Sequence, residues 1–317
     1  MIFVYGTAGG RIESLPKDGD LRTAEWIDLY RPQPAQVAAV EGLGISIPTL
    51  ADMEEIEISN RIYREGDTEY MTVVLPGQTP EKTQIAGPVT FILSPQRLVT
   101  VRHHVPRPFE TFPLRSDKSG TGCASPARLF LGLVEEIIGR LADHLENAGK
   151  QLDAVTRDVF TGSPKPAALQ TALAEIGRET ETIGRVRLGL LTLERALTYI
   201  GQSDTIAAEE AALRPHLKAR LRDIQSLEVH ADFLSARTSN ATDATLGMVN
   251  LAQNATVRVL SGVAALFLPP TLIASVYGMN FAVMPELRWA AGYPFALGLM
   301  LASMLATYLF LKWMKWL

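Results

Sequence analysis

The sequence has a single cysteine, no excess of basic charge and no glycine-rich phosphate loop, and each absence excludes a class of protein. Cys123 is the only cysteine among 317 residues, which excludes an intramolecular disulfide and fits a reducing compartment. We expect it to be a surface or linker thiol. The formal net charge of −4 gives no basic footprint, so nucleic acid is not an expected partner.

A catalytic site is also missing from the pattern of residues. No combination of nucleophile, base and metal ligands is recognisable, so the chain is not expected to be an enzyme or to hold an organic cofactor. The glycine-rich segment 6–10 is a turn without the strand–loop–helix context of a nucleotide site. His103 and His104 are neighbours on an expected strand, where side chains alternate between faces, so they cannot both bind one metal ion without distortion of the strand. We expect them to be solvent-exposed at the strand end.

Two long uncharged stretches stand near the end of the chain. Residues 259–278 and 289–311 contain no charged residue over 20 and 23 positions. A bilayer core about 30 Å thick needs roughly 20 apolar residues of helix, so both stretches are long enough to span it. The short segment between them predicts a helical hairpin with both flanks on the same side of the membrane.

Charge near the span ends predicts the orientation. Arg258 precedes the first span, Lys312 and Lys315 follow the second, and Glu286 and Arg288 cancel in the loop between them. Because Lys and Arg accumulate on the cytoplasmic side, the N-terminal portion and the C-terminal tail are both predicted to be cytoplasmic.

The N-terminal part has the pattern of a mixed α/β domain. Short segments rich in β-branched and aromatic residues predict strands, and two proline-initiated segments between them predict helices. The expected strands are 1–5, 24–29, 69–75, 89–93 and 98–102, and the expected helices are 34–42 and 48–55. The segment 116–126, rich in Ser, Gly, Thr and Lys, is the clearest linker.

Beyond this linker the pattern is helical. Apolar residues at helical spacing predict helices over 129–160 and 167–200, and a continuous helix from about 217 to 277. Sixty residues would make a rod on the order of 90 Å long. Such a helix, with many polar faces, is not stable alone, so we expect it to pack on copies of itself in a bundle of stalks.

One stripe of the first span is apolar in its middle and polar at its ends. It comprises Asn254, Val257, Leu260 or Ser261, Ala264, Leu268, Thr271, Ser275 and Gly278, at spacings of three and four. A polar residue in hydrocarbon is costly unless it faces water or protein, so the stripe is predicted to line a pore. A packing seam of small residues between membrane helices is the alternative, but it gives Asn280 no purpose.

The last 65 or so residues resemble one known family. Tyr277-Gly278-Met279-Asn280-Phe281, then Met284-Pro285-Glu286-Leu287 and Gly292-Tyr293-Pro294, are similar to the signature of the CorA magnesium channels. Further matches are Gln253-Asn254, Phe267-Leu268-Pro269-Pro270-Thr271-Leu272 and Lys315-Trp316-Leu317.

The resemblance implies a homopentameric funnel with one axial pore lined by the first membrane helices. By motif, Gly278, Met279 and Asn280 form the selectivity mouth, and the lining below it is Thr271, Leu268, Leu260, Val257 and Asn254. A ring of amide oxygens suits Mg²⁺, which dehydrates reluctantly, because Asn280 can hydrogen-bond the hydration shell. Apolar rings can gate by dewetting. Glu286 is expected to attract cations.

The resemblance also implies a regulatory site, at which Mg²⁺ bound between cytoplasmic domains closes the pore. One carboxylate of that site matches Asp52, but the partner position on the stalk is Ala219, and Asp223 lies one turn away. We therefore expect Asp52 and Asp223 to be the regulatory metal ligands, with a weak dependence on Mg²⁺.

The sequence thus predicts an α+β membrane protein with an N-terminal α/β cytoplasmic domain, a helical stalk and two C-terminal membrane helices. The expected domains are 1–125, 126–256 and 257–317. The expected function is Mg²⁺ influx, with Co²⁺ and Ni²⁺ as further ions, through a homopentamer in the bacterial inner membrane. A zinc transporter of the ZntB type is one alternative, although Met279 replaces the Ile usual there. A hairpin-anchored scaffold without transport is the other.

Overall fold

The computed structural model describes residues 1–8, 10–16, 20–55, 57, 61–118, 120–161, 166–203, 210–280, 284–314 and 316. The chain divides into two compact units. The first comprises Met1–Arg157 and Ala174–Ala241, and the second Asp158–Leu173 and Thr242–Leu317. The domain boundaries expected at 125 and 256 stay predictions.

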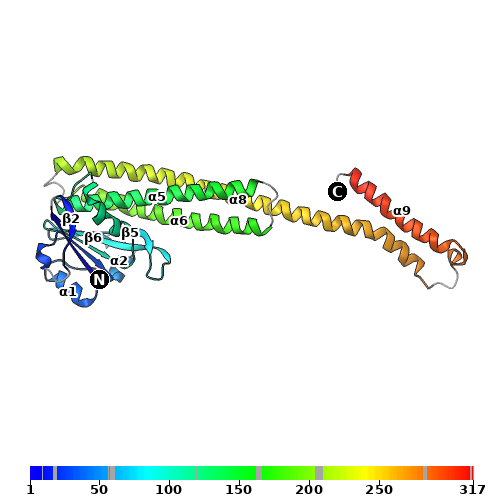
Figure 1. The fold of residues 1–317 in the computed structure, drawn as a ribbon, viewed down its shortest axis with the longest axis horizontal. Coiled ribbons are helices and arrows are strands. Elements are labelled where there is room, and N and C mark those ends of the chain that lie inside the picture. Colours follow the sequence, from blue (N-terminus) through cyan, green and yellow to red (C-terminus); the bar gives the residue numbers. More distant parts are fainter. Residues whose placement is uncertain are drawn as a thin grey trace. The chain divides into compact units, whose positions relative to one another are not determined.

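The first unit is built on a seven-stranded sheet in the order β2-β1-β3-β7-β6-β5-β4 (Figure 1). The strands are β1 (Ile2–Ala8), β2 (Arg11–Ser14), β3 (Trp26–Tyr30), β4 (Ile62–Glu65), β5 (Thr68–Gln78), β6 (Gln84–Leu93) and β7 (Leu98–Arg102). β3 and β7 pair in parallel, and the other neighbours are antiparallel. The five expected strands are confirmed, whereas β2 and β4 were not anticipated.

Helices cover both faces of this sheet, which explains why its central strands are buried almost without alternation. On one face, Val40 of α1 (Pro34–Glu41) and Met53 of α2 (Leu50–Glu54) join a core with Ile27, Ile92 and Val99. On the other face, aromatic rings of α4 (Pro108–Arg115) and α5 (Pro126–Phe160) meet the sheet. The closest ring pairs are Phe91–Phe130, at 5.3 Å between centroids, and Trp26–Phe112, at 6.0 Å.

Three long helices follow, as the apolar spacing predicts. They are α5, α6 (Pro166–Ile200) and α8 (Glu210–Tyr277), and in the first unit they run side by side (Figure 1). Buried apolar residues of α8 recur at a spacing close to seven, at Leu217, Ile224 and Ala231. α8 begins seven residues before the expected start, because Pro215 lies within the helix rather than before it.

The second unit contains the C-terminal part of α8 and all of α9 (Gly292–Trp313), with the short 3₁₀ helix Pro285–Arg288 between them in sequence. Both helices are long and apolar enough to span a membrane, with mean hydropathies of 1.9 and 1.8 in their most apolar 18 residues. Only 6% and 11% of those stretches are buried within the chain. A soluble core helix would be mostly buried, so these two helices fit the expected membrane spans.

Two expectations about single residues were wrong. Cys123 is buried at 2% exposure, with its thiol 3.7 Å from the carbonyl oxygen of Ser116, so it is not a surface thiol. Burial raises the pKa of this thiol. The segment around it therefore packs onto the domain: the backbone N–H of Ile12 donates to the hydroxyl of Ser116 at 3.1 Å.

His104 is also buried, at 2% exposure, rather than exposed at the end of its strand. Its Nε2 lies 2.9 Å from the carbonyl oxygen of Leu75. The ring fills space that Gly77 and Gly87 leave open, since a Cβ on either would come within 2.6 or 2.8 Å of it. His103 is half-buried, and burial lowers its pKa.

Candidate functional site

The apolar residues of the expected pore stripe lie on the C-terminal part of α8 and are exposed, because no other described part of the chain packs over them. Val257, Leu260 and Leu268 are 60%, 69% and 66% exposed. Because one helix carries all three at spacings of three and eight, they lie along the same side. An apolar row of this kind needs lipid, a second helix or a narrow water-filled passage beside it.

Polar groups stand at both ends of this row. Asn254 is exposed at the N-terminal end of the row. The hydroxyl of Thr271 donates within the helix, with the carbonyl oxygens of Phe267 and Leu268 at 2.7 and 2.9 Å. Its proton is thus used for these bonds, and the two lone pairs of the oxygen stay available as acceptors, which suits the water shell of a hydrated cation.

The glycine after α8 sets the position of the expected selectivity mouth. The Gly278 N–H donates to the carbonyl oxygen of Ala274 at 2.9 Å, and a Cβ on Gly278 would lie 3.1 Å from that oxygen. Met279 and Asn280 leave the helix immediately afterwards and are exposed. Within the described part of the chain, the Asn280 amide has no hydrogen-bond partner. Phe281 and the side chain of Glu286 lie outside the described residues.

Asp52 belongs to the cap of α2. Its Oδ2 accepts from the N–H of Thr49 at 2.9 Å and from the Thr49 hydroxyl at 2.7 Å. These two hydrogen bonds lower the pKa of the exposed carboxyl, and the bond from the hydroxyl has the larger effect. Asp52 is thus anionic and accessible, with its Oδ1 available to a cation.

Asp223 has a cationic partner inside its own chain. Its Oδ2 lies 2.9 Å from Arg220, and the same guanidinium lies 2.9 Å from the Oε1 of Glu135 on α5. Farther along the stalk, Asp232 pairs with Arg187 of α6 at 2.9 Å. Among the described residues, no group of three or more His, Cys, Asp or Glu side chains could hold a metal ion. A site with that many side-chain ligands is therefore not formed by the described part of one chain.

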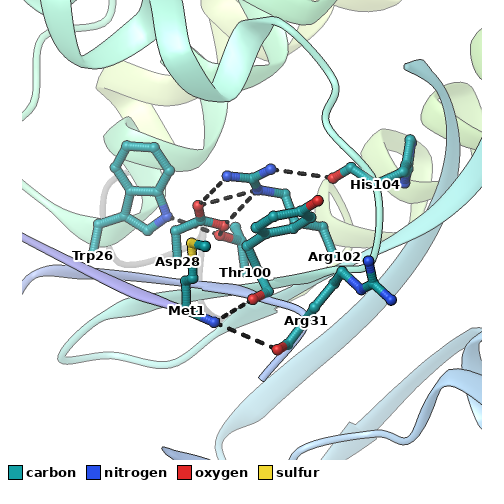
Figure 2. A network of polar contacts seen from close by, with 8 residues as sticks. Met1, Trp26, Asp28, Arg31, Thr100, Arg102 and His104 are labelled. Carbon is teal, nitrogen blue, oxygen red and sulfur yellow. Dashed lines mark hydrogen bonds and ion pairs between the residues drawn. The ribbon is translucent and has the colours of Figure 1, made fainter. Parts of the chain in front are cut away.

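A buried polar network that the sequence did not reveal crosses the centre of the sheet (Figure 2). Arg102 of β7 donates to both oxygens of Asp28 on β3, at 2.9 to 3.1 Å, and to the carbonyl oxygen of His104 at 3.1 Å. The hydroxyl of Thr100 donates to Asp28 at 2.8 Å and accepts from the indole of Trp26 at 3.1 Å. The network satisfies its charges internally, so it holds the parallel pair of β3 and β7 together rather than offering a site.

The signal for this network was present in the strands themselves. Asp28 interrupts the apolar strand β3, and Arg102 ends the apolar strand β7. In the parallel pair of β3 and β7, Asp28 lies beside Thr100, and Tyr30 lies beside Arg102. The sequence does not reveal that these two strands are neighbours, so the ion pair could not be predicted.

An α/β domain joined by a long helical stalk to a two-helix membrane hairpin defines a class of membrane protein with one large soluble part. Residues 22–312 match the profile of the family described as CorA-like Mg²⁺ transporter protein. The magnesium transport protein CorA of Pasteurella multocida is 32% identical over the whole of both chains. This chain belongs to the CorA family.

Solved structures agree on the fold. The CorA magnesium transporter of Methanocaldococcus jannaschii is 16% identical and superposes with a TM-score of 0.75, over 100% of this chain and 99% of that one. The cytoplasmic domain of ZntB from Vibrio parahaemolyticus is 12% identical, with a TM-score of 0.56 over 77% of this chain and 96% of its own. The expected family and fold class are thereby confirmed.

Proposed function

We propose that this chain assembles as a homopentamer that conducts Mg²⁺ into the cell through a pore lined by α8. Membership of the CorA family supports magnesium transport. The uncovered stripe of Asn254, Val257, Leu260, Leu268 and Thr271, ending at Gly278-Met279-Asn280, is the observation that carries the pore assignment.

In this proposal the ion keeps its water at the mouth. Five Asn280 amides would accept hydrogen bonds from, and donate them to, the hydration shell of Mg²⁺, which the ion gives up reluctantly. The apolar rings of Val257, Leu260 and Leu268 would form a barrier that closes by dewetting. The side chain of Glu286 would raise the cation concentration at the entrance.

The membrane potential supplies the driving force in this account. One charge crossing the membrane gains about 2.3 kcal/mol per 100 mV, and a divalent ion gains about twice as much. The protein would lie in the bacterial inner membrane with both termini in the cytoplasm, as the positions of Arg258 and Lys312 favour.

Regulation by internal Mg²⁺ is part of the same proposal. Asp52 would face a stalk carboxylate of the neighbouring subunit, and a bound cation would draw the two subunits together. Asp223 is the proposed partner. Its ion pair with Arg220 already supplies a positive charge, so the proposed dependence on Mg²⁺ is weak.

Ion uptake by the purified full-length protein in liposomes tests the proposal. With a Mg²⁺-sensitive dye inside and an inside-negative potential, we expect uptake well above that of protein-free liposomes. Uptake of Zn²⁺ with none of Mg²⁺ would favour the zinc alternative. Absence of any divalent flux from a correctly assembled protein would favour the scaffold alternative and overturn the proposal.

A further inference from the structure

The membrane part of the chain carries cations without matching carboxylates. From Ala244 to Pro285, and again from Leu287 to Leu317, the sequence contains neither Asp nor Glu. Arg258 and Lys312 lie within these stretches and are exposed. In the described part of the chain, neither of them forms an ion pair.

Helix geometry places both cations at the same depth in the membrane. Arg258 precedes Tyr277, the last residue of α8, by 19 residues, which is about 29 Å of helix. Lys312 follows Gly292, the first residue of α9, by 20 residues, or about 30 Å. Each distance equals the thickness of the hydrocarbon core, so both cations reach the surface opposite the loop.

The nearest carboxylate along α8 is too far away to neutralise Arg258. Asp243 lies 15 residues earlier, about 22 Å along the helix, and the Debye length at physiological salt is about 8 Å. Copies of Asp243 in a symmetric bundle would lie at the same height and come no closer along the axis. No Asp or Glu side chain of the two membrane helices therefore supplies a counter-ion at this level.

Aromatic side chains mark the same level as a lipid interface. Trp313 is 80% exposed and Trp316 is 48% exposed, beside Lys312 at the end of α9. The ring centroids of Phe310 and Trp313 lie 6.3 Å apart. Tryptophan is enriched at the depth of lipid headgroups, because its ring is apolar and its N–H needs a polar partner.

We infer that Arg258 and Lys312 bind the phosphates of anionic phospholipids, which act as the missing counter-ions at the cytoplasmic membrane surface. A lipid phosphate fits better than a dissolved anion because both cations lie at the ends of apolar spans, and because exposed tryptophans follow Lys312. Arg258 lies next to Val257 in sequence, about 100° around the helix, so it points to the flank of the proposed pore stripe.

A consequence for conduction rests on the proposed function. Five Arg258 side chains around one pore would repel an approaching divalent cation. Bound lipid phosphates would cancel this charge, so conduction should be slower in a purely zwitterionic bilayer.

Fluorescence quenching by brominated lipids tests lipid binding without any measurement of conduction. Trp289→Phe protein in equimolar phosphatidylglycerol and phosphatidylcholine would leave Trp313 and Trp316 as the reporters near lipid, since Trp26 is buried in the sheet domain. Bromine is placed on one lipid and then on the other. We expect about five-fold enrichment of phosphatidylglycerol per cation. Adding Arg258→Gln and Lys312→Gln should lower the enrichment about five-fold for each cation removed, whereas the loop control Arg288→Gln should leave it unchanged.

The outcomes separate the sources of the phosphate and the two proposals. Equal quenching by the two lipids in the Trp289→Phe protein would overturn the inference. Loss of the enrichment in millimolar inorganic phosphate would also overturn it, because it would indicate a site for a soluble anion. If the double variant fails to assemble, each single variant should still lower the enrichment about five-fold. Lipid enrichment without Mg²⁺ uptake would refute the proposed function alone, and uptake without enrichment would refute this inference alone.

Discussion

The carboxylate of Asp223 lies 2.9 Å from the guanidinium of Arg220, which reaches Glu135 of α5 at the same distance. Arg220 is largely buried, with 17% of its side chain exposed. The stalk thus carries a built-in cation at the position where the proposed regulatory Mg²⁺ would bind. This arrangement predicts that magnesium and arginine compete for the same charges.

Replacing Arg220 with Gln should increase the response to Mg²⁺. The variant leaves Glu135 and Asp223 without their shared cation, so a divalent ion binding there would stabilise the folded state. We expect millimolar Mg²⁺ at constant ionic strength to raise the Tm of Arg220→Gln by about 2–4 °C more than that of wild type. Arg187→Gln, which breaks the exposed pair with Asp232, is the control. Equal shifts in all three proteins would contradict the prediction.

Removing the proposed regulatory carboxylates should change gating only slightly. In Asp52→Ala and Asp223→Ala, uptake should shut off at a higher internal Mg²⁺ concentration, by less than about five-fold, since exposed ion pairs contribute at most about 1 kcal/mol. The measurement is flux into liposomes preloaded with graded Mg²⁺. If both variants close at the wild-type concentration, these carboxylates do not sense the ion, and gating rests on the apolar rings.

Breaking the central ion pair should destabilise the sheet strongly. Asp28→Asn leaves Arg102 buried without its counter-charge, at a cost of about 3–5 kcal/mol. Hydrogen exchange of the β3 and β7 amides should therefore accelerate about 100-fold or more. Asp67→Asn, in an exposed pair with Arg64, should leave exchange unchanged. The double variant Asp28→Leu/Arg102→Met removes both charges, so its amides should exchange more slowly than those of Asp28→Asn. Equally fast exchange in the two variants would show that an unpaired buried charge is not the cause.

The pH dependence of stability should reveal His104. Burial chiefly, with Arg102 and His103 nearby, lowers its pKa to about 4, against about 6.5 in the unfolded chain. Between these values the unfolded state binds more protons, so stability is full above pH 6.5 and is lost as the pH falls towards 4. The slope should approach about 1.4 kcal/mol per pH unit. His104→Gln should reduce the fall in Tm between pH 7 and pH 5. The control His230→Gln, on the exposed side of α8, should leave that fall unchanged. The same pH dependence of Tm in His104→Gln as in wild type would refute the prediction.

The long helices and the central strands could be predicted from the sequence because their patterns are local. Leucine spacing specified α5 and α6, and two uncharged runs specified the membrane hairpin. The edge strand β2 and the helix α4 were missed because the first has only four residues and the second contains Pro113. Neither has the length over which periodicity is recognisable.

Burial of single polar residues could not be predicted in the same way. His104 is buried because Gly77 and Gly87, on other strands, leave room for its ring. Glycines inside strands are a known sign of close approach, but which group approaches depends on the sheet order. In the candidate site, the stripe on α8 could be predicted from residue spacing alone. The ion pairs of Arg220 with Asp223 and Glu135 could not, because the pair with Glu135 depends on how α5 and α8 pack.

The Asn280 amide ring is the most direct test of the proposed pore. Potential-driven Mg²⁺ uptake should be compared in liposomes containing wild type, Asn280→Ala and Asn147→Ala, the last on the exposed surface of α5. Asn280→Ala removes the polar groups that would hold the hydration shell in the proposed pore, while assembly, checked by size, should be intact. The account predicts loss of uptake in Asn280→Ala and wild-type uptake in Asn147→Ala; near-normal uptake from correctly assembled Asn280→Ala would contradict it.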